Sequence, residues 1–75
     1  MGRKLEHLER DLNLTSREIQ VLWHAAKGDT VPETALEMRL APGTVKNQRQ
    51  AAMRKLKART ITHAVAIAMR AGKIR

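Results

Sequence analysis

The residues with the clearest potential for chemistry lie between Leu40 and Leu56, in the stretch LAPGTVKNQRQAAMRKL. Its polar face carries cations and amides and no carboxylate: Lys46, Asn47, Arg49, Gln50, Arg54 and Lys55. Cations attract phosphates, and the amides of Asn and Gln can pair with base edges in the major groove. A surface with both properties and no acid indicates a binding site for duplex DNA.

One helix over residues 42–56 would position these side chains. Pro42 suits a first helical position, because the N–H that it lacks would be unpaired there and its fixed φ is helical. Helix-forming residues dominate from Thr44 onward. The apolar positions recur on one narrow stripe: Val45, Ala52, Met53 and Leu56. We therefore predict a helix that buries this stripe and exposes the cationic face.

Two shorter helices are predicted before it, and each begins with a capping box. Thr15 and Glu18 form the first box, and Thr30 and Glu33 form the second. Gly28 is expected to end the first helix, and the second should end near residue 39. A short helix, a tight turn and a longer basic helix make a helix-turn-helix unit.

The first of these helices is predicted to bury one apolar stripe, with Val21 and Ala25 on its flank. The stripe consists of Ile19, Leu22, Trp23 and Ala26. Trp23 is the only aromatic residue, and on such a stripe we expect it in the core rather than as a platform for stacking bases.

A last helix is predicted from the cap at Thr60 to Gly72. Its core positions are expected to be Ile61, Ala64, Val65 and Ala68. Ala66, Ile67 and Met69 lie off that stripe, so the apolar face is wider than one contact needs. This breadth predicts a helix that packs on two partners, one of which could be a second copy of the chain.

The N-terminal residues form a separate part of the chain in this reading. Residues 1–12 are expected to be a short extension, helical from residue 3 because its leucines recur at helical spacing. The candidate linker is residues 11–14, and the main domain is expected to span residues 13–75.

The charge distribution supports a polyanionic partner. The chain has 75 residues and a formal net charge of +8, with all acidic residues at or before Glu37 and only basic ones after it. One-sided charge of this kind is typical of a surface that binds a polyanion. No apolar run approaches the ~20 residues that span a bilayer, and we find no signal peptide. We therefore expect a cytoplasmic, nucleoid-associated protein with no membrane partner.

No combination of residues in the sequence indicates catalysis. The chain has no cysteine, its three histidines are scattered, and it has no glycine-rich phosphate loop. We therefore expect no enzymatic activity, no metal site, no cofactor and no small-molecule ligand.

A series of residues distributed along the chain points to a known family. The series comprises Leu14, Thr15, Arg17, Glu18, Val21, Leu22, Gly28, Glu33, Ala35, Gly43, Thr44, Val45, Lys46, Asn47, Lys55, Leu56, Ala64, Val65 and residues 68–72. In these residues and their ungapped spacing, the chain resembles the LuxR/GerE-type helix-turn-helix domain of bacterial transcription regulators. The resemblance covers about residues 13–72, and it is greatest to the short, single-domain members.

The resemblance implies an all-α, four-helix domain with helix 42–56 in the major groove. Base contacts are then expected from Lys46, Asn47 and Gln50. Contacts to the DNA backbone are expected from Thr30, Thr44, Arg49, Arg54, Lys55, Lys57 and Arg59. The last helix would pair with that of a second subunit through Ala64, Ala66, Ile67, Met69 and Arg70, so a homodimer on a roughly two-fold site is expected.

The chain also departs from the family pattern. The family usually has Ser where this chain has Ala41, and Gly where it has Arg39. The loss of the Ser hydroxyl removes a capping acceptor from helix 42–56. These two positions, with an exposed Leu36, keep a second hypothesis open. In it, the chain is a protein-interaction module of helix-turn-helix shape that binds another regulator or RNA polymerase.

Overall fold

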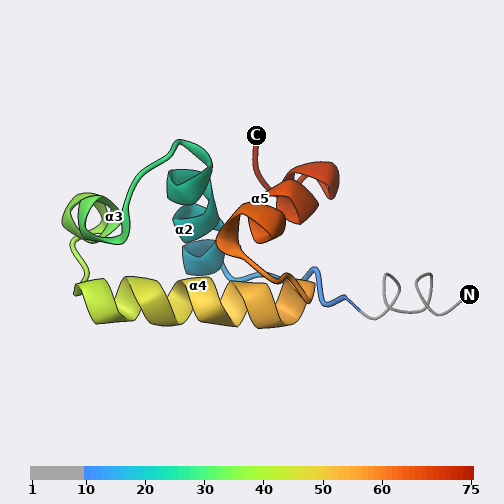
Figure 1. Cartoon of the computed structure of the whole chain (residues 1–75), viewed down its shortest axis with the longest axis horizontal. Helices are drawn as coiled ribbons and strands as arrows, with labels where there is room; N and C mark the ends of the chain where they lie inside the picture. Colours follow the sequence, from blue (N-terminus) through green and yellow to red (C-terminus); the bar gives the residue numbers. More distant parts are fainter. Residues whose placement is uncertain (1–9) are drawn as a thin grey trace, which may run out of the picture.

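The computed structural model describes residues 10–75, which contain four helices and no strand. The helices are α2 (Ser16–Ala26), α3 (Val31–Met38), α4 (Pro42–Leu56) and α5 (Ile61–Arg70). Helix α4 runs along one side of the molecule, and the other three helices all lie on the same side of α4 (Figure 1). The predicted all-α, four-helix fold is confirmed, and the bounds of α4 are those expected from the sequence.

Threonine side chains cap three of the helices. The Oγ1 atom of Thr15 accepts a hydrogen bond of 3.1 Å from the Glu18 N–H, and Oε1 of Glu18 accepts one of 2.9 Å from the Thr15 N–H. Thr30 and Glu33 repeat this exchange at the start of α3. Thr60 caps α5 through the His63 N–H. Each cap satisfies a backbone donor that the helix leaves unpaired, and all three predictions are confirmed.

The turn between α3 and α4 is made without the residues that best suit it. Arg39 adopts a left-handed conformation with φ of 58°, which is unfavourable for a side chain that has a Cβ. Ala41 is the N-cap of α4 and offers no side-chain hydrogen bond. The turn therefore depends on packing of the flanking helices.

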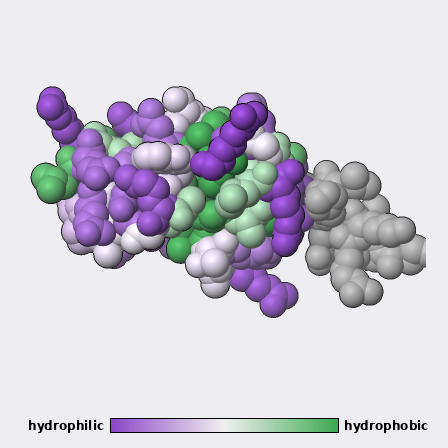
Figure 2. Space-filling model, turned by 90° about the horizontal axis from the view of Figure 1, so that it is seen from above, coloured by the Kyte–Doolittle hydropathy of each residue, from purple (hydrophilic) through white to green (hydrophobic). Residues whose placement is uncertain are grey.

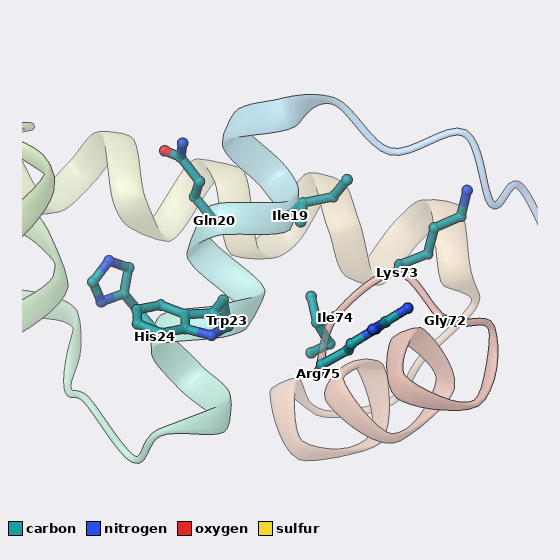
Figure 3. Close-up of a pocket in the computed structure, with 8 residues that line it drawn as sticks. All are labelled: Ile19, Gln20, Trp23, His24, Gly72, Lys73, Ile74 and Arg75. Atoms are coloured by element: carbon teal, nitrogen blue, oxygen red, sulfur yellow. The ribbon is translucent and has the colours of Figure 1, made fainter.

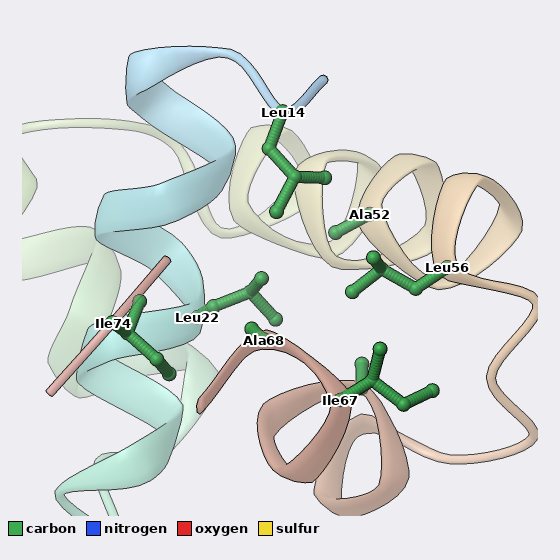
Figure 4. Packing of buried hydrophobic residues seen from close by; sticks show 8 residues of the cluster. Leu14, Leu22, Ala52, Leu56, Ile67, Ala68 and Ile74 are labelled. Atoms are coloured by element: carbon green, nitrogen blue, oxygen red, sulfur yellow. The ribbon is translucent and has the colours of Figure 1, made fainter. Parts of the chain in front are cut away.

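The core has two parts, one on each side of α2. Val21, Ala35 and Val45 hold α2, α3 and α4 together. The larger cluster joins α2, α4 and α5 with the C-terminal residues (Figure 4), and it contains Leu14, Leu22, Ala52, Leu56, Ala64, Ile67, Ala68 and Ile74. The smaller part fixes α3 on α4, and the larger part fixes α5.

Three predictions about burial are wrong, and one of them concerns Ala26, which was expected on the buried stripe of α2 but is exposed. Trp23 was expected in the core but is 43% exposed, because α2 buries Val21 and Leu22 on sides of the helix that face α4 and α5. Ile67 was expected off the core stripe but is only 5% exposed. It packs in the larger cluster because α5 lies in the angle between α2 and α4 and buries more than one stripe.

The segment before α2 is attached to the end of α4. Residues 10–15 are not helical, and the rest of the helix predicted from residue 3 lies outside the described residues. The Asp11 N–H donates to the Lys55 carbonyl at 2.8 Å, and Nε of Arg10 donates to the Leu56 carbonyl at 2.7 Å. These bonds satisfy carbonyls that the last turn of α4 leaves unpaired. Residues 11–14 are therefore attached to the domain through the Asp11 N–H and the buried Leu14, and the predicted division between extension and domain stays a prediction.

Candidate nucleic-acid interface

The exposed face of α4 collects the side chains predicted to contact bases. Lys46, Asn47 and Gln50 are exposed, as is Arg54 one turn further on. Val45, Ala52 and Leu56 are fully buried on the opposite side of the helix. In Figure 1 no described segment lies beyond α4 on its outer side. The burial of one stripe therefore leaves a helix face of cations and amides open for a ligand.

Helix α3 and the turn that follows it hold α4 in place. Ala35 of α3 packs against Val45, and the Leu40 N–H donates to the Ala35 carbonyl at 2.9 Å, which closes the end of α3. Thr34 is fully buried, and its hydroxyl donates to the Thr30 carbonyl at 2.8 Å. The two helices thus pack into one unit that presents one face of α4.

Arg49 belongs to the fold rather than to this open face. Its Nη2 atom donates to the Asp29 carbonyl at 3.1 Å, in the turn between α2 and α3. Its Nε atom is buried and has no hydrogen-bond partner among the described residues. In the protein without DNA, Arg49 is thus engaged within the fold, and its predicted contact with the DNA backbone stays a prediction.

Lys55 flanks the other side of the stripe and is also engaged within the protein. Its Nζ atom lies 2.9 Å from Oε1 of Glu18 and donates to the Asn13 carbonyl at 3.2 Å. Burial raises the pKa of Glu18, but the bonds from Lys55 and from the Thr15 N–H outweigh it and the pKa lies below its ordinary value. The carboxylate stays charged and holds the ammonium. Lys55 therefore links α4 to α2 in the protein without DNA, and its predicted contact with phosphate stays a prediction.

The other predicted backbone contacts lie near this face or at a helix start. Lys57 and Arg59 follow α4 and are exposed, and Thr44 is half-buried in its first turn. Thr30 is exposed at the start of α3. Their contacts with DNA stay predictions.

The predicted dimer residues on α5 divide into two groups. Ala64 and Ile67 are buried in the core of the protomer and expose little surface to another subunit, and their predicted role in a dimer stays a prediction. Ala66 is half-buried, and Met69 and Arg70 are exposed. The sequence pattern alone could not separate these groups, because both are apolar or amphipathic positions on the same short helix.

A small charged network joins α2 to α3. Nδ1 of His24 lies 2.9 Å from Oδ2 of Asp29 and 3.3 Å from Oε1 of Glu37, and these three groups could in principle ligate a cation. Nζ of Lys27 lies 3.2 Å and 3.5 Å from the same two carboxylates. The lysine ammonium thus offsets part of their charge, and the network is an ion-pair link between the helices.

The fold and the exposed face together define a helix-turn-helix protein: two packed helices joined by a tight turn, with the second presenting a cationic surface. Residues 12–68 match the model of a family described as "Bacterial regulatory proteins, luxR family". The chain belongs to this family.

A relative from Streptomyces coelicolor, described as "Response regulator RamR", is 39% identical over 62 residues, which make up 83% of this chain and 31% of that protein. The chain thus spans about a third of that relative's length.

Among residues 10–75, none of the helices has the length and hydropathy of a membrane-spanning segment.

Proposed function

We propose that the chain binds duplex DNA in a sequence-specific manner and regulates transcription. The observation that carries this proposal is the exposed face of α4, on which Lys46, Asn47 and Gln50 lie together without a carboxylate. In a major groove, Lys can reach guanine acceptors, and Asn or Gln can pair with adenine. These three side chains are the base readers of the proposal, and this function would place the chain at the nucleoid.

Contacts to phosphate are assigned to exposed side chains around the base readers. Arg54, Lys57 and Arg59 supply charge, and Thr44 and Thr30 lie at the first turns of α4 and α3. Arg49 and Lys55 act indirectly by fixing α4 on its neighbours. The proposed active form is a homodimer on a roughly two-fold site, with Met69 and Arg70 of α5 at the contact between subunits.

A second function is supported by one observation on α3. Leu36 is 81% exposed, more than any other large apolar side chain that the structure describes. It would suit a module that binds another regulator or RNA polymerase through α3.

Selection of bound sequences from random duplex DNA separates the two proposals. We expect enrichment of a partly palindromic site, and we expect binding to that site to disappear when Lys46 and Gln50 are both replaced by alanine. A matched variant, Leu36→Ala, should keep DNA binding. The absence of enrichment by the folded chain would contradict DNA recognition and favour the interaction module.

A further inference from the structure

A shallow groove lies on a different side of the molecule from the exposed face of α4. It has a volume of about 560 Å³ and is bounded by α2 and the C-terminal residues (Figure 3). Its lining consists of Ile19, Gln20, Trp23, His24, Gly72, Lys73, Ile74 and Arg75. No residue of α4 contributes to it, so the groove is separate from the proposed DNA surface.

The floor of the groove is apolar and contains the exposed Trp23. Trp23 is 43% exposed and belongs to neither of the two core clusters. Nζ of Lys27 lies 4.5 Å from the ring centroid, and the His24 ring meets it edge-on at 5.1 Å. Ile19 and Ile74 extend the apolar surface beside the ring (Figure 3). A tryptophan that is held in place by its neighbours and open on one side is typical of an anchor site in protein recognition.

The charge around this floor is positive. Lys73 and Arg75 are exposed and flank Ile74, whose side chain is buried against the core. None of the lining residues is acidic. Asp29 and Glu37, the acids that contact His24, are not among the lining residues and are paired with Lys27.

The geometry of α2 places this groove away from DNA. Glu18 and Val21 face α4, the first through Lys55 and the second through the small core cluster. Gln20 and Trp23 lie roughly half a turn around the helix from that side, since α-helices have about 3.6 residues per turn. Figure 2 looks onto the molecule from the side opposite α4 and shows hydrophobic side chains in the middle of this face, bordered by hydrophilic ones.

We propose that this groove binds an acidic peptide segment of another protein, with one aliphatic or aromatic side chain seated against Trp23. The apolar floor suits such an anchor, and Lys73 and Arg75 suit carboxylates on either side of it. A volume of about 560 Å³ accommodates a few side chains. Because the groove and the exposed face of α4 lie on different sides, the chain can hold this peptide and DNA at the same time.

The test is a selection of displayed random peptides against the full chain, followed by affinity measurements on the enriched peptides. We expect sequences that combine acidic residues with an apolar anchor, and a change in Trp23 fluorescence on binding. Trp23→Ala and Lys73→Glu should each weaken binding by about tenfold or more. Arg59→Glu makes the same charge change in the connector between α4 and α5 and should leave peptide affinity unchanged.

Several results would overturn the proposal. These are no enriched peptide, enriched peptides without acidic residues, an unchanged Trp23 signal, or equal losses for Lys73→Glu and Arg59→Glu. Lys73→Glu replaces an exposed side chain, and a circular dichroism spectrum and melting curve like those of the wild type will show that it folds. Its DNA binding is expected to be unchanged, so failure of the groove and failure of DNA recognition are distinguishable.

Discussion

Nζ of Lys55 in α4 lies 2.9 Å from Oε1 of Glu18 in α2, and Glu18 also closes the capping box of α2 with Thr15. One carboxylate thus holds both the start of α2 and the position of α4. The basic face of this protein consequently has two kinds of cation. Lys46 and Arg54 are open to a ligand, whereas Lys55 and Arg49 are engaged by the fold.

Stability should depend on this carboxylate in an acid-sensitive manner. Because the pKa of Glu18 in the folded protein lies below its ordinary value of 4.5, its stabilising effect is present above that value and is lost as the pH falls through the lower folded pKa. Glu18→Gln should lower the free energy of unfolding by about 1–2 kcal/mol at neutral pH and by less in acid.

Urea denaturation at neutral and acidic pH checks this prediction. Glu33→Gln is the matched control, because Glu33 closes the second capping box at an exposed position. Glu33→Gln should lower the free energy of unfolding by less than Glu18→Gln does. An equal loss for both variants at every pH would contradict a specific role for the Glu18–Lys55 pair.

The missing cap of α4 should be easy to restore. Ala41 is the N-cap and makes no side-chain hydrogen bond. Ala41→Ser should add an acceptor for the first turn of α4 and stabilise the fold by about 1 kcal/mol. Ala41→Val offers no acceptor and serves as the control. Thermal unfolding of both variants measures the difference, and a gain with valine equal to that with serine would rule out capping as its cause.

Base reading and phosphate contact should separate along α4. Gln50→Ala should relax sequence preference at one or two positions of each half-site, where a good pair is worth about 1–3 kcal/mol. Arg54→Ala should weaken binding to all sequences about equally, since it is assigned to phosphate. Affinities for the selected site and its single-base variants measure both effects. Uniform weakening by both substitutions would show that Gln50 is not a reader.

The salt dependence of DNA binding should reflect the cations assigned to phosphate. With roughly three phosphate contacts per subunit, from Arg54, Lys57 and Arg59, the slope of log affinity against log salt should be about −2.7. Arg54→Ala should reduce its magnitude by about one unit. Lys55→Met should lower stability but leave the slope unchanged, because Lys55 is paired with Glu18. A reduced slope for Lys55→Met would return that residue to the phosphate contacts.

The dimer contact on α5 can be tested with a pair of neighbouring substitutions. Met69 is 53% exposed, so Met69→Glu should weaken self-association and operator binding while the protomer stays folded. Ile67 is 5% exposed, so Ile67→Glu should destabilise the protomer itself by about 2–5 kcal/mol. Sedimentation and circular dichroism distinguish the two results. An unchanged association state for Met69→Glu would place any interface elsewhere.

The sequence by itself determined the local structure of this protein. The capping boxes at Thr15 and Thr30, Pro42 at the first turn of α4 and the apolar stripe through Val45, Ala52 and Leu56 all have the structure expected of them. Caps and periodic stripes depend on residues close together in the chain. The exposed face of α4 with Lys46, Asn47 and Gln50 follows from the same periodicity.

Only the tertiary structure decided which side chains are buried against or paired with neighbouring helices. Lys46 and Lys55 are both lysines of α4, but only Lys55 pairs with Glu18, which lies 37 residues earlier in the chain. Trp23 was expected to be buried but is exposed, and Ile67 was expected off the core but is buried. The reason is that α2 and α5 each pack against more than one helix, and the apolar stripe of a single helix does not predict this. Burial and charge pairing depend on contacts distant in sequence, and those contacts exist only once the helices are packed.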